Sequence, residues 1–452
     1  MNNRIIPFLT LSTLLVAACD VLDVEPAQQV ADNQAITNAA GAQAAILGTY
    51  SQVQEYYQLN YPVLGYLPAD NVIFNGTLSQ YLQVDQNAYT PNNDIVTATW
   101  TQLYQVINSA NNLIEGVPVL TDPTFTADAR NRILGEAYLL RALAYFDLGR
   151  GWGGVPLVLK PTRSAQDGQG IRRSTLDQTY DQVLGDLDLA EPLLPEVNVA
   201  PATTQLRNRA AKNAARALRA RLHLYRRQWA EAEGNATRVI GNNGYELVSP
   251  YRAFSTAPFG SRESVFELSF TNADPNNQWN NWFPSALGGQ FTLQPSPGFV
   301  TLVNNPATGG NRNALVATIA IGGTTATYGN LYARSRERDD PAYLIRLAEL
   351  YLIRAEARAQ QNNLAGALAD LNAVRKRAGL AEATAATPEA VQLAIENERR
   401  IEFAFEAHRW FDLVRTERAD DVLGITDRNK WLFPIPFVDI GADPDLEQNP
   451  GY

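Results

Sequence analysis

The chain has 452 residues, 45% of them hydrophobic, so it can bury a large core, and its length alone allows two or three domains. It carries 47 acidic and 37 basic side chains and a net charge of −10, which argues against nucleic acid as a partner. Its single cysteine excludes a disulfide framework and a CxxC redox or metal centre.

The first residues have the organisation of a lipoprotein signal peptide. Arg4 supplies a positive charge, residues 5–16 are apolar, and Val16-Ala17-Ala18-Cys19 closes the stretch as a lipobox. The apolar run is shorter than the ~20 residues of a membrane-spanning helix, and the alternative is a buried first helix around an ordinary cysteine. We predict a signal peptide over residues 1–18, a lipid on Cys19 and an acidic tether over residues 19–31.

From residue 32 the sequence favours helices, because alanine and leucine recur at helical spacing. Two segments repeat: Arg219-Ala220 is followed nine residues later by Trp229-Ala230-Glu231-Ala232, and Arg354-Ala355 by Leu364-Ala365-Gly366-Ala367. Each pattern is typical of helix, tight turn, helix, and such hairpins stack on one another. We predict a mainly α fold built as a tetratricopeptide-like array of helical hairpins; the alternative is a generic alanine-rich bundle.

Two stretches, at about residues 57–93 and 249–340, break the helical pattern. Both are rich in aromatic residues, glycine, proline and asparagine, and the second contains one predicted strand at residues 265–270, where apolar and polar side chains alternate. Long segments without regular structure often bind ligands. We therefore expect these loop-rich stretches to carry the function.

The loop after that strand, residues 272–283, is dense in amides and tryptophans. Pyranose rings stack their C–H faces on indole and phenol rings, and their hydroxyls pair with amide, carboxylate and guanidinium groups. The alternative for each tryptophan is that it anchors the loop on the helices. The predicted ligand-binding residues are Trp279, Trp282, Asn280, Asn281, Tyr66, Asp70, Asn71 and Tyr81.

Catalytic and metal motifs are absent from the sequence. No HExxH, paired CxxC, Gly-rich phosphate loop or G-x-S-x-G turn occurs, so we predict no catalytic residue, no metal ligand and no cofactor. The loop at Asp274 fails the calcium-loop pattern because Trp279 stands where glycine is required, which leaves a surface calcium ion open but not predicted. We interpret the row Glu398, Glu402 and Glu406, interleaved with arginines, as a salt-bridged helix face. Glycosidases need only two carboxylates, so a surface hydrolase stays an alternative.

The carboxy-terminal third resembles the SusD/RagB family of outer-membrane nutrient-binding lipoproteins. The similar blocks are YLIRLAELYLIRAEA at 343–357, ADLNAVRKRAGL at 369–380, ERRIEFAFE at 398–406, HRWFDLVR at 408–415, FPIP at 433–436 and the ending QNPGY at 448–452. Earlier blocks agree, including GGVPL at 153–157. The resemblance is weakest at 250–340, where the family itself varies, so it does not carry over a particular ligand.

The resemblance implies a single domain over residues 32–452. In it, a helical array of four tetratricopeptide-like units covers 32–248 and 341–417, an irregular ligand-binding insert with minor β structure covers 249–340, and a tail covers 418–452. It also implies a lipid anchor at Cys19 in the outer membrane, facing outwards, and a SusC-like TonB-dependent transporter as partner. Such a protein captures oligosaccharides and hands them over without breaking bonds; a peptide receptor of the RagB kind is the second expectation.

Overall fold

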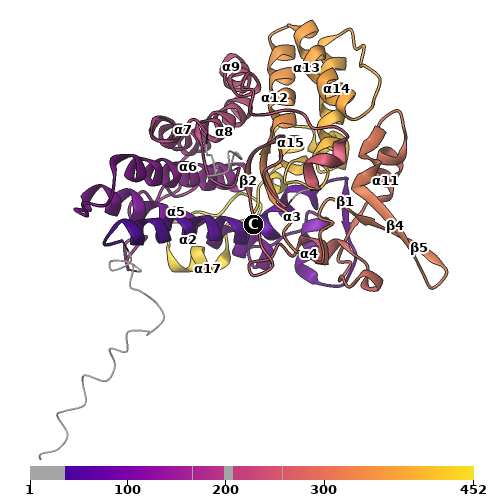
Figure 1. Cartoon of the computed structure of the whole chain (residues 1–452). Coiled ribbons are helices and arrows are strands. Elements are labelled where there is room, and N and C mark those ends of the chain that lie inside the picture. Colours follow the sequence, from indigo (N-terminus) through magenta and orange to yellow (C-terminus); the bar gives the residue numbers. More distant parts are fainter. Residues whose placement is uncertain (1–35, 165, 198–206, 257) are drawn as a thin grey trace, which may run out of the picture.

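The computed structural model describes residues 36–164, 166–197, 207–256 and 258–452. Within these ranges helices predominate and the strands are short, which confirms the mainly α prediction (Figure 1). The predicted signal peptide, the lipobox cysteine and the tether lie outside the described residues.

The regular elements follow one another along the chain with short strands between groups of helices. The α-helices are α2 (Ala39–Gln58), α3 (Asn60–Tyr66), α4 (Ser79–Asp85), α5 (Asp94–Gly116), α6 (Ala127–Trp152), α7 (Leu176–Leu193), α8 (Lys212–Tyr225), α9 (Trp229–Ile240), α10 (Gln278–Trp282), α11 (Pro297–Asn304), α12 (Leu347–Gln360), α13 (Leu364–Arg377), α14 (Pro388–Glu402), α15 (Arg409–Arg415), α16 (Ala419–Leu423) and α17 (Phe437–Ala442). The strands are β1 (Val72–Phe74), β2 (Ser264–Leu268), β3 (Leu293–Pro295), β4 (Val316–Ile321), β5 (Thr324–Gly329) and β6 (Ala342–Arg346). Short 3₁₀ helices are η1 (Val117–Val119), η2 (Tyr251–Ser255), η3 (Ser285–Leu287), η4 (Gly310–Leu315) and η5 (Arg428–Trp431).

The long helices form an array in which each packs on its neighbour in the chain. Helix α2 packs on α5, α5 on α6, α6 on α7, α7 on α8 and α8 on α9, and α12 then packs on α9 and on α13 (Figure 1). The array therefore continues across the irregular insert, whose ends meet where β2 pairs with β6 just before α12. Neighbour-on-neighbour packing of this kind is that of a solenoid, and it confirms the predicted tetratricopeptide-like array.

The two repeated segments form the hairpins α8–α9 and α12–α13, as predicted. In both turns the residue two positions before the second helix has a left-handed backbone: φ is 57° at Arg227 and 61° at Asn362. Asparagine adopts this conformation more readily than arginine does. The two hairpins thus share a turn geometry although their turn sequences differ.

Arginines of the array form interhelical ion pairs. Arg354 of α12 lies 2.6 Å from Asp370 of α13, and Arg141 of α6 lies 2.6 Å from Asp186 of α7. Arg219 of α8 instead forms ion pairs with carboxylates of α7, the preceding helix. Small alanines bring the helices close, and these guanidinium–carboxylate pairs fix how neighbouring helices are aligned.

Residues 57–93 are more regular than predicted, because α2, α3 and α4 cover much of the stretch. The hydroxyls of Tyr56, Tyr57 and Tyr61 donate to the buried carboxylate of Asp147 on α6, at 3.3, 3.0 and 2.7 Å. Tyrosines that suggested a binding loop are therefore core residues with a polar partner on a distant helix. The prediction of an irregular segment was wrong for its first ten residues.

Three antiparallel strand pairs involve the insert among the described residues: β4 pairs with β5 inside it, β3 pairs with β1 of the earlier segment, and β2 pairs with β6, which directly follows the insert. The predicted strand at 265–270 is confirmed as β2, which ends two residues earlier. Gly322 and Gly323, with φ of 55° and 85°, form the two-residue turn that joins β4 and β5. This hairpin projects from the insert beside α11 (Figure 1).

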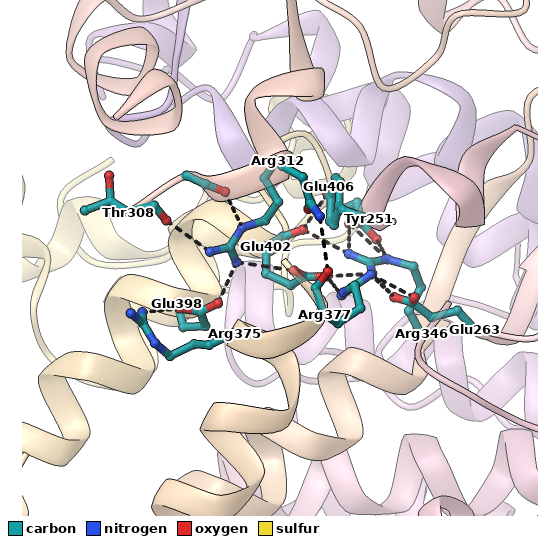
Figure 2. Close-up of polar contacts among 12 residues, drawn as sticks. Tyr251, Glu263, Thr308, Arg312, Arg346, Arg375, Arg377, Glu398, Glu402 and Glu406 are labelled. Atoms are coloured by element: carbon teal, nitrogen blue, oxygen red, sulfur yellow. Dashed lines mark hydrogen bonds and ion pairs between the residues drawn. The ribbon is translucent and has the colours of Figure 1, made fainter. Parts of the chain in front are cut away.

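A buried charge network joins the insert to the array (Figure 2). We define it as Glu263, Arg312, Arg346, Arg377, Glu402 and Glu406, each at most 6% exposed. Arg346 lies 2.6 Å from Glu263, 2.9 Å from Glu402 and 2.6 Å from Glu406, and Arg377 bridges Glu263 and Glu402. Burial disfavours the charged form of Glu402, but Arg377, Arg346 and Arg312 outweigh it and hold the pKa of Glu402 below its ordinary value.

The network explains the carboxylate row noted in the sequence. Glu402 and Glu406 are ion-paired and buried, and Glu398 pairs with Arg312 at 2.7 Å, so the structural interpretation of this row is confirmed. Their partners, however, come from β6, α13 and η4, and not from the interleaved arginines of α14 and α15. Because Glu263 and Arg312 belong to the insert, the row holds the insert in place.

Gly65→Ala is expected to lower the free energy of unfolding by about 1–3 kcal/mol, because an added Cβ would lie 2.5 Å from the backbone Cα of Ala407. Gly48→Ala is the matched control: it is also helical, it has no neighbouring atom within 4 Å, and it is expected to stabilise by up to about 1 kcal/mol. Chemical denaturation of both variants measures the difference. Equal effects of the two substitutions would contradict the close approach of α3 to residue 407.

Candidate functional site

An aromatic cluster, made of two groups of contacting rings, lies around β3, where this strand contacts β1 of the earlier segment and α10 and β5 of the insert. We define it as Phe74, Tyr81, Trp279, Phe283 and Tyr328. Phe74 stacks on Tyr81 with ring centres 5.1 Å apart, while Phe283 meets Trp279 edge-on at 6.1 Å and Tyr328 at 4.9 Å. Tyr81, Trp279 and Tyr328 are partly exposed, whereas Phe74 and Phe283 are buried beneath them. The cluster thus combines partly exposed phenol and indole rings with buried phenylalanine rings.

Local hydrogen bonds fix the two segments that carry the cluster. The carboxylate of Asp85 accepts from the backbone N–H of Phe74 at 3.3 Å, which closes the turn between β1 and α4. Asn276 accepts from the N–H of Gln278 at 2.9 Å and donates to the carbonyl of Asp340 at 2.8 Å, so α10 starts at a fixed place. Both side chains therefore bond to backbone groups and hold the local chain path.

Four predicted ligand-binding residues are buried, and the structure gives them packing roles. Trp282 is 1% exposed, and its ring lies 4.6 Å from that of Phe405 and 5.6 Å from that of Tyr66. Burial raises the pKa of Tyr66, and nearby Tyr332 and Tyr81 raise it further. Asn281 is 8% exposed and accepts from the hydroxyl of Thr292. These three side chains therefore lie in the interior, and their predicted contact with a ligand stays a prediction.

Asp70 and Asn71 also have structural partners. The carboxylate of Asp70 accepts from Arg409 at 2.8 Å and pairs with Arg400 at 3.1 Å, while fully buried Asn71 exchanges hydrogen bonds with Arg400 at 2.9 and 2.8 Å. Burial opposes ionisation of Asp70, but Arg409 and Arg400 outweigh it and lower the pKa of the carboxyl. This pair anchors the segment before β1 on α14 and α15. Asn71 is therefore buried as well, and its predicted contact with a ligand stays a prediction.

Tyr81, Trp279 and Asn280 remain accessible among the predicted residues. All three are partly exposed, and the side-chain amide of Asn280 makes no hydrogen bond with the described part of the chain. Tyr328 is a further member that sequence reasoning missed. The glycine pair at 322–323 between two β-rich runs predicts a hairpin and is the signal that would have found it.

Several polar atoms around α10 are buried and have no hydrogen-bond partner among the described residues. They are the hydroxyl of Tyr66, both side-chain polar atoms of Gln278, and the indole N–H groups of Trp279 and Trp282. A buried polar group that is left without a partner costs about 1–3 kcal/mol.

The described residues contain no group of three or more His, Cys, Asp and Glu side chains placed to hold a metal ion. His408 is 7% exposed, and burial lowers its pKa to about 3, so it is neutral near pH 7. Across the same described ranges, every helix is too short or too polar to cross a membrane.

Two family models match the chain. The model of the SusD family matches residues 255–429, and the model described as "starch-binding associating with outer membrane" matches residues 20–224. SusD-like protein P38 of Formosa agariphila is 28% identical over an alignment that covers 100% of this chain and 99% of that protein. A SusD-like protein of Bacteroides ovatus is 23% identical over 92% of this chain and 82% of its own length.

Solved structures share the fold. A SusD superfamily protein of Bacteroides vulgatus superposes with a TM-score of 0.80 at 20% identity, over 92% of this chain and 99% of that one. A laminarin-binding SusD-like protein superposes with a TM-score of 0.79 at 23% identity, over 92% of this chain and 100% of its own. With both family models, full-length relatives and the fold in agreement, the chain belongs to the SusD/RagB family, for which one matching model describes starch binding in association with the outer membrane.

Proposed function

We propose that this protein is a cell-surface lipoprotein, anchored through Cys19, that captures oligosaccharides and delivers them to a SusC-like TonB-dependent transporter in the outer membrane. Family membership and the laminarin-binding relative of the same fold support carbohydrate as the ligand class. We place the ligand on the aromatic cluster. Co-purification of a TonB-dependent barrel with the tagged protein from native outer membranes tests the delivery step.

The observation that carries this assignment is the pair of partly exposed rings Tyr81 and Trp279. Tyr81 lies on α4, which contacts β1, and Trp279 lies on α10, which contacts β3, the strand that pairs with β1. A pyranose ring lying on either would bury C–H groups on a π face, and the part-exposed amide of Asn280 supplies both a donor and an acceptor for hydroxyls. The buried Phe74 and Phe283 keep the two rings in place through contacts at 5.1 and 6.1 Å. Binding would therefore require little reordering of side chains.

Peptide capture of the RagB kind is the second candidate, because strand β4 has an edge that pairs with no other strand in the described part of the chain. An extended peptide could add to such an edge through backbone hydrogen bonds. The residues of β4 and β5 carry no charge, so nothing on the hairpin repels an incoming strand.

Tyr81→Ala and Trp279→Ala are each expected to weaken oligosaccharide binding about tenfold, since each removes one stacking platform. Isothermal calorimetry of residues 20–452 against laminarin and starch oligosaccharides measures the change. Tyr351→Ala, a part-exposed tyrosine on α12 of the array, serves as the control and is expected to bind like the unmodified protein. Binding of peptides but not sugars, or sugar binding indifferent to both substitutions, would sink the assignment.

A further inference from the structure

A second cleft, on the array and separate from the aromatic cluster, has the size and lining of a ligand site. It has a volume of about 640 Å³ and lies between the α8–α9 turn, α12, α14 and α15. Its lining residues are Leu224, Arg227, Trp229, Glu356, Gln360, Pro388, Glu389, Gln392, Leu393, Glu396, Arg399, Asp412, Arg415, Thr416 and Arg418. We call it the array cleft; Figure 1 shows α12 standing between α9 and α14. Small-molecule sites commonly fall between about 300 and 1,000 Å³.

Most of the charged groups of the array cleft form ion pairs with one another. Arg415 binds Glu356 through two contacts at 2.6 and 2.8 Å and meets Asp412 at 2.9 Å, and Arg399 binds Asp412 at 2.8 Å. Burial opposes ionisation of Asp412, yet Arg399 and Arg415 outweigh it and hold the pKa of this carboxyl well below its ordinary value. The polar floor of the cleft is thus held together by ion pairs.

The remaining cleft arginines are paired as well. Arg418 lies 3.0 Å from Glu396, and Arg227 lies 2.9 Å from Glu417. The lining contains four arginines and four carboxylates, so its formal charge is balanced. A ligand with a free carboxylate group would find no unpaired arginine to meet it. A neutral ligand with many hydroxyls fits, because paired guanidiniums still offer N–H donors and paired carboxylates still offer lone pairs.

The walls of the cleft supply apolar surface next to this floor. Trp229, at the start of α9, is partly exposed, and Leu393 on α14 is 48% exposed. An indole beside fixed donors and acceptors suits the apolar face and hydroxyl rim of a sugar ring. In addition, one guanidinium nitrogen of Arg399, Nη1, is buried and has no hydrogen-bond partner in the described structure. The residue as a whole is 3% exposed.

We propose that the array cleft is a second saccharide site, which takes a neutral oligosaccharide of about two or three rings and is independent of the aromatic cluster. The proposal rests on the proposed function for the class of ligand. It places one sugar ring on Trp229 and its hydroxyls on the Arg399, Asp412, Arg415 and Glu356 floor. A protein with two such sites would hold separate parts of one long glycan, which raises affinity without new contacts at either site.

The test uses residues 20–452 carrying Tyr81→Ala and Trp279→Ala, so that the aromatic cluster is removed. Saturation-transfer NMR with laminaritriose, maltotriose and trialanine is expected to show transfer to at least one trisaccharide and none to the peptide. Adding Leu393→Arg, which fills the mouth of the cleft from an exposed position, is expected to reduce that transfer at least fivefold. Leu189→Arg on α7, a leucine that is 49% exposed, is the matched control and is expected to leave it unchanged.

Trp229→Leu keeps an apolar side chain at the wall and is expected to give the same loss as Leu393→Arg, with melting temperatures showing that both variants are folded. Loss of all saccharide transfer in the Tyr81→Ala, Trp279→Ala protein overturns the array cleft and leaves the aromatic cluster standing. Transfer that Leu393→Arg and Leu189→Arg affect equally, or transfer to trialanine alone, also overturns it. If cleft substitutions abolish binding in the otherwise unmodified protein and cluster substitutions do not, the cleft stands and the aromatic-cluster assignment falls.

Discussion

Arg346→Met is expected to lower the free energy of unfolding by about 3–5 kcal/mol, because it leaves carboxylates buried without their counter-charge. Arg346 is 1% exposed and donates to Glu263, Glu402 and Glu406, and it is the ion-pair partner of Glu406 in the described structure. Glu402 and Glu263 keep Arg377, but Glu406 would keep no cation. Urea or guanidinium denaturation of the purified variant measures the loss.

Two further substitutions make this result interpretable. Arg172→Met removes an exposed pair with Asp445, in which the arginine side chain is 80% exposed, and is expected to change stability by less than about 1 kcal/mol. Arg346→Lys keeps the charge but loses the planar fork, and is expected to fall between the two. If Arg346→Met gives no folded protein while Arg346→Lys does, the network is equally supported. A loss as small as that of Arg172→Met would show that the network is dispensable.

Glu267→Gln is expected to stabilise the protein at alkaline pH. Glu267 lies on β2, is fully buried, and has one carboxyl oxygen without a hydrogen-bond partner in the described structure. Burial raises its pKa from 4.5 to about 7. The folded state therefore holds this proton more tightly than the unfolded state, so the stability linked to it is complete below pH 4.5 and is lost as the pH rises through 7.

The raised pKa sets the size of the effect. At pH 8 the glutamine variant is expected to exceed the unmodified protein in unfolding free energy by at most about 3 kcal/mol, whereas near pH 4 the two should be equal. Thermal denaturation at both pH values measures the difference, with Glu382→Gln on the exposed surface as a control that changes neither value. A gain that is the same at both pH values would show that ionisation of Glu267 is not responsible.

Local patterns in the sequence determined the helical hairpins. Arg219-Ala220 and Arg354-Ala355 lie on first helices, and the second helices begin at Trp229 and Leu364, where the repeat placed them. Helical spacing and small residues act over one or two turns, so neighbouring residues are sufficient to specify them. The family blocks of the carboxy-terminal third indicated the same fold.

Tertiary structure alone decided which aromatic residues face solvent. Trp279 and Trp282 stand three residues apart in one loop, yet Trp282 packs between Tyr66 and Phe405 while Trp279 stays partly exposed. Burial depends on what the rest of the chain places against a side chain. A tryptophan-rich loop therefore indicates a binding region but not which indole binds.

The charged residues show most clearly the difference between what the sequence determines and what the tertiary structure decides. The row Glu398, Glu402 and Glu406 indicated ion pairing, but Glu402 meets Arg346, 56 residues away, and Glu263 meets Arg377 at a separation of 114 residues. The sequence by itself determined that these carboxylates are paired, since charges at helical spacing on one face require counter-charges. Only the tertiary structure decided the partners, because a desolvated carboxylate binds whichever guanidinium the packing of β6, α13 and η4 brings into the interior.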